Sequence, residues 1–197
     1  VYGGAVSVEY GKFVMEGGTI QNCYARNGGA ISVDYGKNAV LTIGGGSGTP
    51  VIKNNSAIGP GGGLAVSDTS SKVEIKGGLF EDNYSTGSDE APVNLKNGAE
   101  LYVGYGCEVK MSGGTIKNSG TGQYAISSEG KFTVTGDAVI DVSAEHCTLS
   151  CAGENNYFFD FDNGYAIIKG RYAAGDAFSI SKTNGLRFGA DENSLGE

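Results

Sequence analysis

Residues 3–24 read GGAVSVEYGKFVMEGGTIQNCY, and the chain repeats the scheme of this stretch several times. Each copy holds three short runs in which apolar residues alternate with small or polar ones, and glycines separate the runs. Clear copies cover residues 3–24, 28–55 and 61–83, and looser copies cover residues 91–119 and 124–142. Self-similarity at a period of this length is the signature of a solenoid, in which each copy is one structural unit.

The apolar residues fall into columns when the copies are aligned on their glycines. Their period of two residues indicates strands with one buried face and argues against helix. The columns are Val6/Val8, Ile31/Val33, Leu64/Val66, Val93/Leu95 and then Ile126 in the first run; Phe13/Met15, Leu41/Ile43, Val73/Ile75, Val109/Met111 and Phe132/Val134 in the second; Ile20, Ile52, Phe80, Ile116 and Val139 in the third. Strands this short bury their apolar face only when the copies stack, at about 4.8 Å per copy. The sequence therefore predicts an all-β fold, a right-handed parallel β-helix with three strands per coil, although the alternation alone does not fix the hand.

A pair of polar residues follows the third run of each copy. The pairs are Asn22-Cys23, Asn54-Asn55, Asp82-Asn83 and Asn118-Ser119. Asparagines stacked at a corner can hydrogen-bond one another's side-chain amides along the axis of the stack. We therefore predict a structural ladder formed by Asn22, Asn54, Asn83 and Asn118, not a ligand site.

The composition suits a tightly turning β-fold, because the 197 residues include 35 glycines and only three prolines. The formal net charge of −8 argues against nucleic acid and anionic membrane surfaces as partners, since both require a basic surface. No apolar run approaches the roughly 18 residues that a membrane-spanning helix needs. The chain starts within a repeat, and we expect it to be part of a longer protein.

The sequence changes character after the five copies, and we divide it into repeat coils at residues 1–152 and a second part at residues 153–197. The second part has aromatic residues in alternation at 156–161 and keeps glycine corners, but lacks the GGTI motif. Two interpretations stay open: terminal coils whose aromatic residues close the apolar column, or a separate β-domain. The first is favoured, because about 45 residues is short for an independent core.

The four cysteines fit no metal site. Cys23 lies at a corner and Cys107 in an insertion, and we expect both thiols to be free. Cys147 and Cys151 are four residues apart, which leaves open either a small disulfide loop in an oxidising compartment or two free thiols. A zinc site formed by His146 with these two cysteines lacks a fourth ligand at a suitable spacing. No metal and no cofactor are therefore predicted.

Several motifs resemble known repeats: GGAI at residues 28–31, GGTI at residues 17–20 and 113–116, and FEDN at residues 80–83. They are similar to the GGAI and FxxN repeats of bacterial surface proteins with the pectin-lyase-like fold, which include the chlamydial polymorphic membrane proteins and large repeat proteins of gut anaerobes. The resemblance implies an extracellular protein, secreted or anchored at the cell surface. It also implies a role in adhesion, through contact with glycans or with host proteins.

Enzymes share this fold, so catalysis is the alternative function. Polysaccharide lyases that resemble this fold use a calcium-binding acidic cluster, and pectin hydrolases use clustered aspartates near a histidine. Here the single histidine, His146, lies outside the clear copies, and Asp137 and Asp141 form the only aspartate pair within four residues in the repeats. We therefore predict a non-enzymatic surface β-helix segment, adhesin-like or a structural scaffold, without catalytic residues. A polysaccharide lyase or hydrolase remains the alternative, because stacked coils can bring distant carboxylates together.

One repeated turn combines aromatic with charged residues. Glu9-Tyr10 and Asp34-Tyr35 occur at the same place in consecutive copies, each followed by Gly-Lys. Stacking places the two carboxylates within a strand spacing, where a lysine or a bound cation must offset their repulsion. In the structural interpretation the lysines that follow provide this offset. In the functional interpretation Glu9, Tyr10, Asp34 and Tyr35 form an exposed strip that binds a sugar or a protein.

Overall fold

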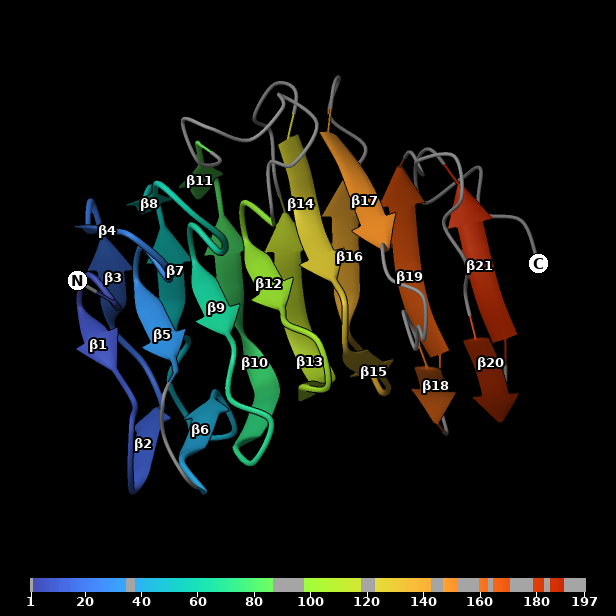
Figure 1. Cartoon of the computed structure of the whole chain (residues 1–197). Helices are drawn as coiled ribbons and strands as arrows, with labels where there is room; N and C mark the ends of the chain where they lie inside the picture. The colour runs from blue at the N-terminus through green and yellow to red at the C-terminus, as the bar shows by residue number, and fades with distance from the viewer. Residues whose placement is uncertain are drawn as a thin grey trace.

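The computed structural model describes residues 2–34, 38–86, 98–117 and 123–142, and the backbone of five later strands between residues 147 and 189. All of the regular secondary structure in these residues is β-strand, and the strands pair in parallel (Figure 1). The all-β class predicted from the alternation is therefore confirmed. This part of the chain has no helix long and apolar enough to span a membrane.

The strands belong to three sheets, in which neighbouring strands come from successive copies. The first sheet contains, in order, β1 (Val6–Ser7), β5 (Ile31–Val33), β9 (Leu64–Val66), β12 (Leu101–Val103), β14 (Gln123–Ser128) and β17 (Cys147–Cys151). The third sheet contains β4 (Tyr24–Ala25), β8 (Ser56–Ala57) and β11 (Tyr84–Ser85). Each strand thus lies on the equivalent strand of the copy before it.

The second sheet has twelve strands on two faces that meet at a corner. One face holds β2 (Lys12–Met15), β6 (Val40–Ile43), β15 (Lys131–Val134), β18 (Asp160–Asp162) and β20 (Ser179–Lys182); the other holds β3 (Thr19–Gln21), β7 (Val51–Lys53), β16 (Val139–Val142), β19 (Tyr165–Gly170) and β21 (Gly185–Gly189). The long strands β10 (Lys72–Glu81) and β13 (Glu108–Lys117) join the faces, since β10 pairs with β6 at its start and with β7 at its end. The glycine pair Gly77-Gly78 lies between these two halves of β10.

The apolar columns predicted from the alternation form one continuous core. In the first run, for example, Ile31 and Leu64 are paired and completely buried. Burying a side chain of this size stabilises the fold by about 1.5–3 kcal/mol relative to leaving it exposed. The first coil differs, because its core residues Val6, Phe13 and Ile20 are only partly buried.

Two members of the columns differ from the prediction. The fourth copy contributes β12 (Leu101–Val103) to the first sheet, where it pairs with β9, in place of residues 93–95, which lie outside the described part. In the third run of the fifth copy, the completely buried residue is Ile140, paired with Ile116, and not Val139. In both segments more than one apolar residue fits the alternating pattern. The pairing with the neighbouring strand shows which residue occupies the column.

An asparagine ladder exists, but in a different column from the one predicted. Register places Asn22, Asn54 and Asp82 in one column, and Cys23, Asn55 and Asn83 in the next. In the first column the residues are exposed and have φ values of 58°, 53° and 54°. In the second, Asn55 and Asn83 are buried, and Asn55 Nδ2 donates to Asn83 Oδ1 at 2.9 Å. This corrects the predicted ladder: Asn55 replaces Asn22 and Asn54, Asn83 keeps its place, and Asn118 lies outside the described residues.

The ladder also satisfies the backbone at its corner and ends on a buried carboxylate. Asn55 Nδ2 donates to the carbonyl of Ile20, and Asn83 Nδ2 donates to that of Ile52. Asn83 N donates to Glu100 Oε1 at 3.0 Å, and Asn83 Nδ2 donates to Glu100 Oε2. Glu100 is completely buried. Because buried polar groups need partners, these side chains are structural parts of the corner.

Two of the cysteines have free thiols, and two lie at opposite ends of one strand. Cys23 and Cys107 are free, as predicted. Cys147 and Cys151 are the first and last residues of β17. An extended strand separates Cα atoms four residues apart by about 13 Å, whereas a disulfide requires less than about 7 Å. The disulfide alternative is therefore incompatible with this strand.

The strands after residue 152 continue the parallel pairing (Figure 1). β18 pairs with β15, β19 with β16, β20 with β18, and β21 with β19. Most of the aromatic alternation at residues 156–161 lies outside the described residues. The division into residues 1–152 and 153–197 stays a prediction.

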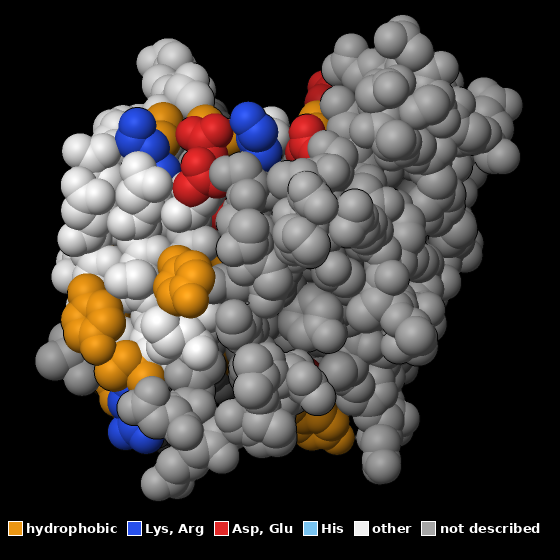
Figure 2. All heavy atoms as spheres, turned by 90° about the horizontal axis from the view of Figure 1, so that it is seen from above, with side chains coloured by type: hydrophobic (Ala, Val, Ile, Leu, Met, Phe, Trp, Pro, Cys, Tyr) orange, Lys and Arg blue, Asp and Glu red, His pale blue; other side chains and the backbone are white. Residues whose placement is uncertain are grey.

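Charged residues alternate in sign along one column on the outer surface. Lys53, Glu81, Lys117 and Asp141 lie opposite one another in successive strands. The Nζ atom of Lys117 lies 3.5 Å from Glu81 Oε1. Figure 2 shows blue and red side chains alternating along its upper edge. Opposite charges at directly opposed strand positions stabilise the pairing by roughly 0.2–1 kcal/mol each.

Candidate functional site

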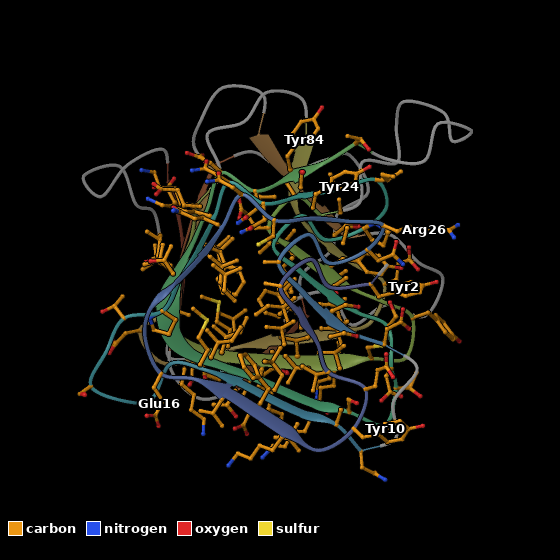
Figure 3. The ribbon with its side chains drawn as sticks, turned by 90° about the vertical axis from the view of Figure 1, so that its left-hand side faces the viewer. Tyr2, Tyr10, Glu16, Tyr24, Arg26 and Tyr84 are labelled. Atoms are coloured by element: carbon orange, nitrogen blue, oxygen red, sulfur yellow. The ribbon has the colours of Figure 1, made fainter. Side chains whose placement is uncertain are left out.

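The predicted strip lies at the turn between the first and second sheets. The register of β1 and β5 places Glu9 and Asp34 at equivalent positions. Glu9 is exposed and Tyr10 is 69% exposed, and Figure 3 shows the Tyr10 ring projecting from a corner of the molecule. Asp34, in contrast, is only 8% exposed, and Tyr35 lies outside the described residues. Of the four predicted residues, the structure thus brings Glu9 and Tyr10 together on the surface and places Asp34 beneath it.

Later coils add acidic and aromatic residues to the same turn. The register of β9, β12 and β14 places Asp68 and Tyr105 in the column of Tyr10, and Glu129 in the column of Glu9. Tyr105 is 67% exposed, whereas Asp68 and Glu129 are half-buried. We call Glu9, Tyr10, Asp68, Tyr105 and Glu129 the acidic–aromatic corner.

Sequence reasoning missed three members of this corner. Asp68, Tyr105 and Glu129 lie one or two residues after the ends of β9, β12 and β14. Counting from the strand ends would have found them. In the fourth copy, however, the prediction assigns the first strand to residues 93–95, and counting from the end of that segment does not reach Tyr105.

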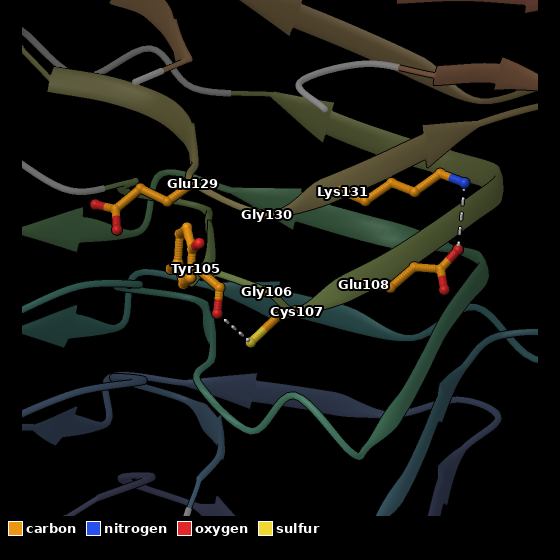
Figure 4. Close-up of a pocket in the computed structure, with 7 residues that line it drawn as sticks. All are labelled: Tyr105, Gly106, Cys107, Glu108, Glu129, Gly130 and Lys131. Carbon is orange, nitrogen blue, oxygen red and sulfur yellow. Dashed lines mark hydrogen bonds and ion pairs between the residues drawn. The ribbon is translucent and has the colours of Figure 1, made fainter. Parts of the chain in front are cut away.

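A pocket of about 350 Å³ opens beside the corner, between the fourth and fifth coils (Figure 4). It is lined by Tyr105, Gly106, Cys107, Glu108, Glu129, Gly130 and Lys131. In Figure 4, Tyr105 and Glu129 lie on one side of the pocket, and the pair of Glu108 with Lys131 lies on the other. Lys131 Nζ is 3.8 Å from Glu108 Oε1. The pocket therefore has an aromatic ring and a carboxylate on one side and an ion pair on the other.

A tight turn holds Tyr105 at the surface. Cys107 N donates to the Gly104 carbonyl at 3.0 Å, and Gly106 has a φ of 73°. This is the pattern of a type II turn, which favours glycine at its third residue and presents the second, here Tyr105, at the tip. Gly130 packs under the turn, where a Cβ would lie 2.5 Å from the carbonyl oxygens of Gly104 and Cys107. A side chain at Gly130 would thus displace the turn that carries Tyr105.

Two serines fix the carboxylate of Asp68. Ser70 donates to Asp68 Oδ1 from N at 3.2 Å and from Oγ at 3.0 Å, and Ser71 Oγ donates to Asp68 Oδ2. Partial burial raises the pKa of Asp68, but the hydrogen bonds from Ser71 and Ser70 outweigh burial and lower the pKa below its ordinary value. Asp68 is therefore negatively charged at neutral pH.

Two groups beside the corner are held in their protonated forms. Burial, followed by the charges of Asp68 and Asp34, raises the pKa of the Cys107 thiol to about 11. Burial, followed by the charge and the hydrogen bond of Glu129, raises the pKa of Tyr102. A protonated thiol is a poor nucleophile, so Cys107 acts in packing.

No protein-family model, curated protein or solved structure matches the chain. Within the described ranges, no three His, Cys, Asp or Glu side chains gather closely enough to hold a metal ion. What the corner offers is negative charge from Glu9, Asp68 and Glu129 beside the exposed faces of Tyr10 and Tyr105.

Proposed function

We propose that the chain is part of a right-handed parallel β-helix displayed outside the cell, and that it binds a partner protein without catalysing a reaction. Parallel pairing of strands from successive copies supports the β-helix. Crossover connections between parallel strands are right-handed in about 98% of cases, which supports the hand. The similarity of the GGAI and FEDN motifs to repeats of bacterial surface proteins supports the extracellular location.

The gathering of acidic and aromatic residues from several coils at one corner carries the proposal. Tyr10 and Tyr105 lie three coils apart, about 14 Å along the stack, and the column between them includes Asp68. Carboxylates attract lysine and arginine side chains, and tyrosine faces add a cation–π attraction. A surface that combines both groups suits a positively charged segment of a partner protein.

The alternative, a polysaccharide lyase or hydrolase, has less support from the carboxylates at the pocket. Glu108 lies 3.7 Å from Lys110 Nζ and 3.8 Å from Lys131 Nζ. The negative charge of Glu129 acts on the hydroxyl of the half-buried Tyr102 and contributes to its raised pKa. Hydrolysis of a glycoside needs one carboxylic acid that donates a proton to the leaving group. Both glutamates are instead engaged by neighbouring side chains, which favours binding.

Fluorescence anisotropy with a labelled oligo-arginine peptide tests the proposal. Tyr10→Ala and Tyr105→Ala should each weaken binding by about five- to thirty-fold, the effect of losing one aromatic contact. Glu9→Gln should weaken binding at low salt, and the difference should shrink as added salt screens the charge.

Glu16→Gln is the matched control, because it removes the same charge from a different corner of the molecule (Figure 3). It should leave the peptide affinity nearly unchanged. Equal losses for Glu16→Gln and Glu9→Gln would show that the peptide responds to net charge alone and would overturn the proposal. Release of oligosaccharides from an acidic polysaccharide would favour the enzyme instead.

A further inference from the structure

The outward surface of the third sheet carries a row of side chains that is separate from the acidic–aromatic corner. β4, β8 and β11 pair with Tyr24 opposite Ser56, and Ser56 opposite Tyr84. Tyr24 is 63% exposed and Tyr84 is 44% exposed. In Figure 3 both tyrosines project from the same side of the molecule, away from Tyr10. We call Tyr24, Ser56 and Tyr84 the tyrosine row.

The row is fixed to a rigid part of the fold. Ser56 N donates to the Cys23 carbonyl at 2.9 Å, and Tyr84 N donates to the Asn55 carbonyl at 2.8 Å. The row residues directly follow Cys23, Asn55 and Asn83, the column that contains the asparagine ladder, where Asn55 is buried and hydrogen-bonded to Asn83. A ligand that contacts the two rings therefore meets a preorganised surface, and little ordering of the backbone opposes binding.

The spacing of the rings indicates the kind of ligand. Tyr24 and Tyr84 are two strands apart, which is about 9.5 Å along the stack. In an extended chain of equatorially linked pyranoses, each sugar advances by nearly one strand spacing, and every second sugar presents the same face. The two rings therefore match alternate sugars. The small side chain of Ser56 leaves room for the sugar between them and offers it a hydroxyl group.

We propose that the tyrosine row binds a neutral polysaccharide of equatorially linked pyranoses, with the sugar chain lying along the stack of coils. A tyrosine ring presents an apolar face to the C–H groups of a sugar, and its hydroxyl remains available for a hydrogen bond. Figure 2, which views this side of the molecule, shows separate hydrophobic side chains surrounded mainly by white atoms, which are backbone and uncharged polar side chains, with charged side chains toward the edges. The net charge of −8 disfavours polyanionic chains. Because the row and the corner are different surfaces, this inference does not rest on the function proposed above.

Titration calorimetry with cellohexaose and chitohexaose tests the inference, with maltohexaose as the control whose axial linkages coil the chain. The protein should bind at least one of the first two probes and should not bind maltohexaose. Tyr24→Ala and Tyr84→Ala should each weaken binding by about five- to thirty-fold. Tyr10→Ala and Tyr105→Ala remove rings that are at least as exposed as those of the row, but from the corner, and should leave the affinity for these sugars unchanged. Cellobiose is too short to reach both rings, and should bind about tenfold more weakly than cellotetraose.

Two further variants separate loss of binding from loss of folding. Tyr24→Phe keeps the ring and should keep most of the affinity. Ser56→Lys leaves both rings in place but inserts a long charged side chain between them, and it should abolish binding with an unchanged thermal melt. The inference would be overturned if the protein bound neither cellohexaose nor chitohexaose, or if it bound maltohexaose equally well. It would also be overturned if cellobiose and cellotetraose bound with equal affinity, or if Ser56→Lys left binding unaffected.

Discussion

At the scale of single residues, the turn after each third strand shows how position decides a role. Asn54 and Asn55 are adjacent and chemically identical. Asn54 is exposed and has a φ of 53°, whereas Asn55 is buried and hydrogen-bonds both Asn83 and the Ile20 carbonyl. Asparagine serves in both places, because it tolerates left-handed backbone and because its amide both donates and accepts.

Replacement of each asparagine by glycine should therefore have different effects on the free energy of unfolding. Asn55→Gly leaves buried partners of its amide unsatisfied, at about 1–3 kcal/mol each, and we expect a total loss of about 3 kcal/mol. Asn54→Gly keeps the positive φ without a Cβ and should change stability by less than about 0.5 kcal/mol. Urea unfolding of the two variants measures the difference. Similar midpoints for both would contradict the ladder.

The hydrogen bonds to Asp68 predict a pH-dependent stability. Because its pKa is lowered in the folded protein, Asp68 stabilises the fold at pH values above its ordinary pKa, and this contribution is lost as the pH falls through the lowered value. Ser71→Ala removes one of these bonds and should reduce stability by about 1 kcal/mol at pH 7. The difference from the wild type should shrink below about pH 4.

Denaturation of the Ser71→Ala variant across this pH range measures the effect of Asp68. Ser112→Ala, at an exposed serine, is the control and should show no pH-dependent change. A Ser71→Ala effect that stays constant down to pH 2 would assign the loss to packing and not to the carboxylate.

At the scale of the elements, the corner of the second sheet depends on a close approach of two backbones. Gly44 follows β6 and has a φ of 79°, and a Cβ there would lie 2.5 Å from Gly77 N in β10. Gly11 precedes β2 and also has a φ of 79°, but nothing lies within 4 Å of its Cβ position. The two glycines therefore share the backbone strain and differ in the space around them.

The same substitution at both glycines separates these two effects. Gly11→Ala should lower the free energy of unfolding by about 1–2 kcal/mol, which is the penalty for left-handed backbone. Gly44→Ala adds a clash with the backbone of β10 and should lower it by at least about 1 kcal/mol more. Chemical denaturation checks the order. Equal losses would mean that the two strands separate easily at this corner.

The strands could be predicted from the sequence because an apolar period of two residues repeats in every copy. Which of two adjacent residues faces the core could not be predicted where the two are alike, as with Val139 and Ile140 or with Asn54 and Asn55. There, the register of the adjacent strand decides which residue is buried. The acidic–aromatic corner was predictable in part. Its first two members belong to a repeated motif, whereas the other three meet only because coils of unequal length stack in register.

At the scale of the whole molecule, one continuous hydrophobic core supports several separate surfaces. The core is continuous along the stack, while the corner that holds Tyr10 and the row that holds Tyr24 and Tyr84 face different directions (Figure 3). In a stacked architecture each coil contacts only its neighbours, so stability is close to a sum of coil and interface terms. Substitutions on one surface therefore provide controls for the other.

The column of alternating charges constrains how the number of coils can change during evolution. Loss of the coil that carries Glu81 would place Lys53 opposite Lys117, and loss of the next coil would place Glu81 opposite Asp141. Like charges directly opposite each other destabilise a pair of strands. Loss or duplication of two successive coils keeps every charge opposite its complement. Descendants of this chain should therefore lengthen and shorten more readily by even numbers of repeats than by odd ones.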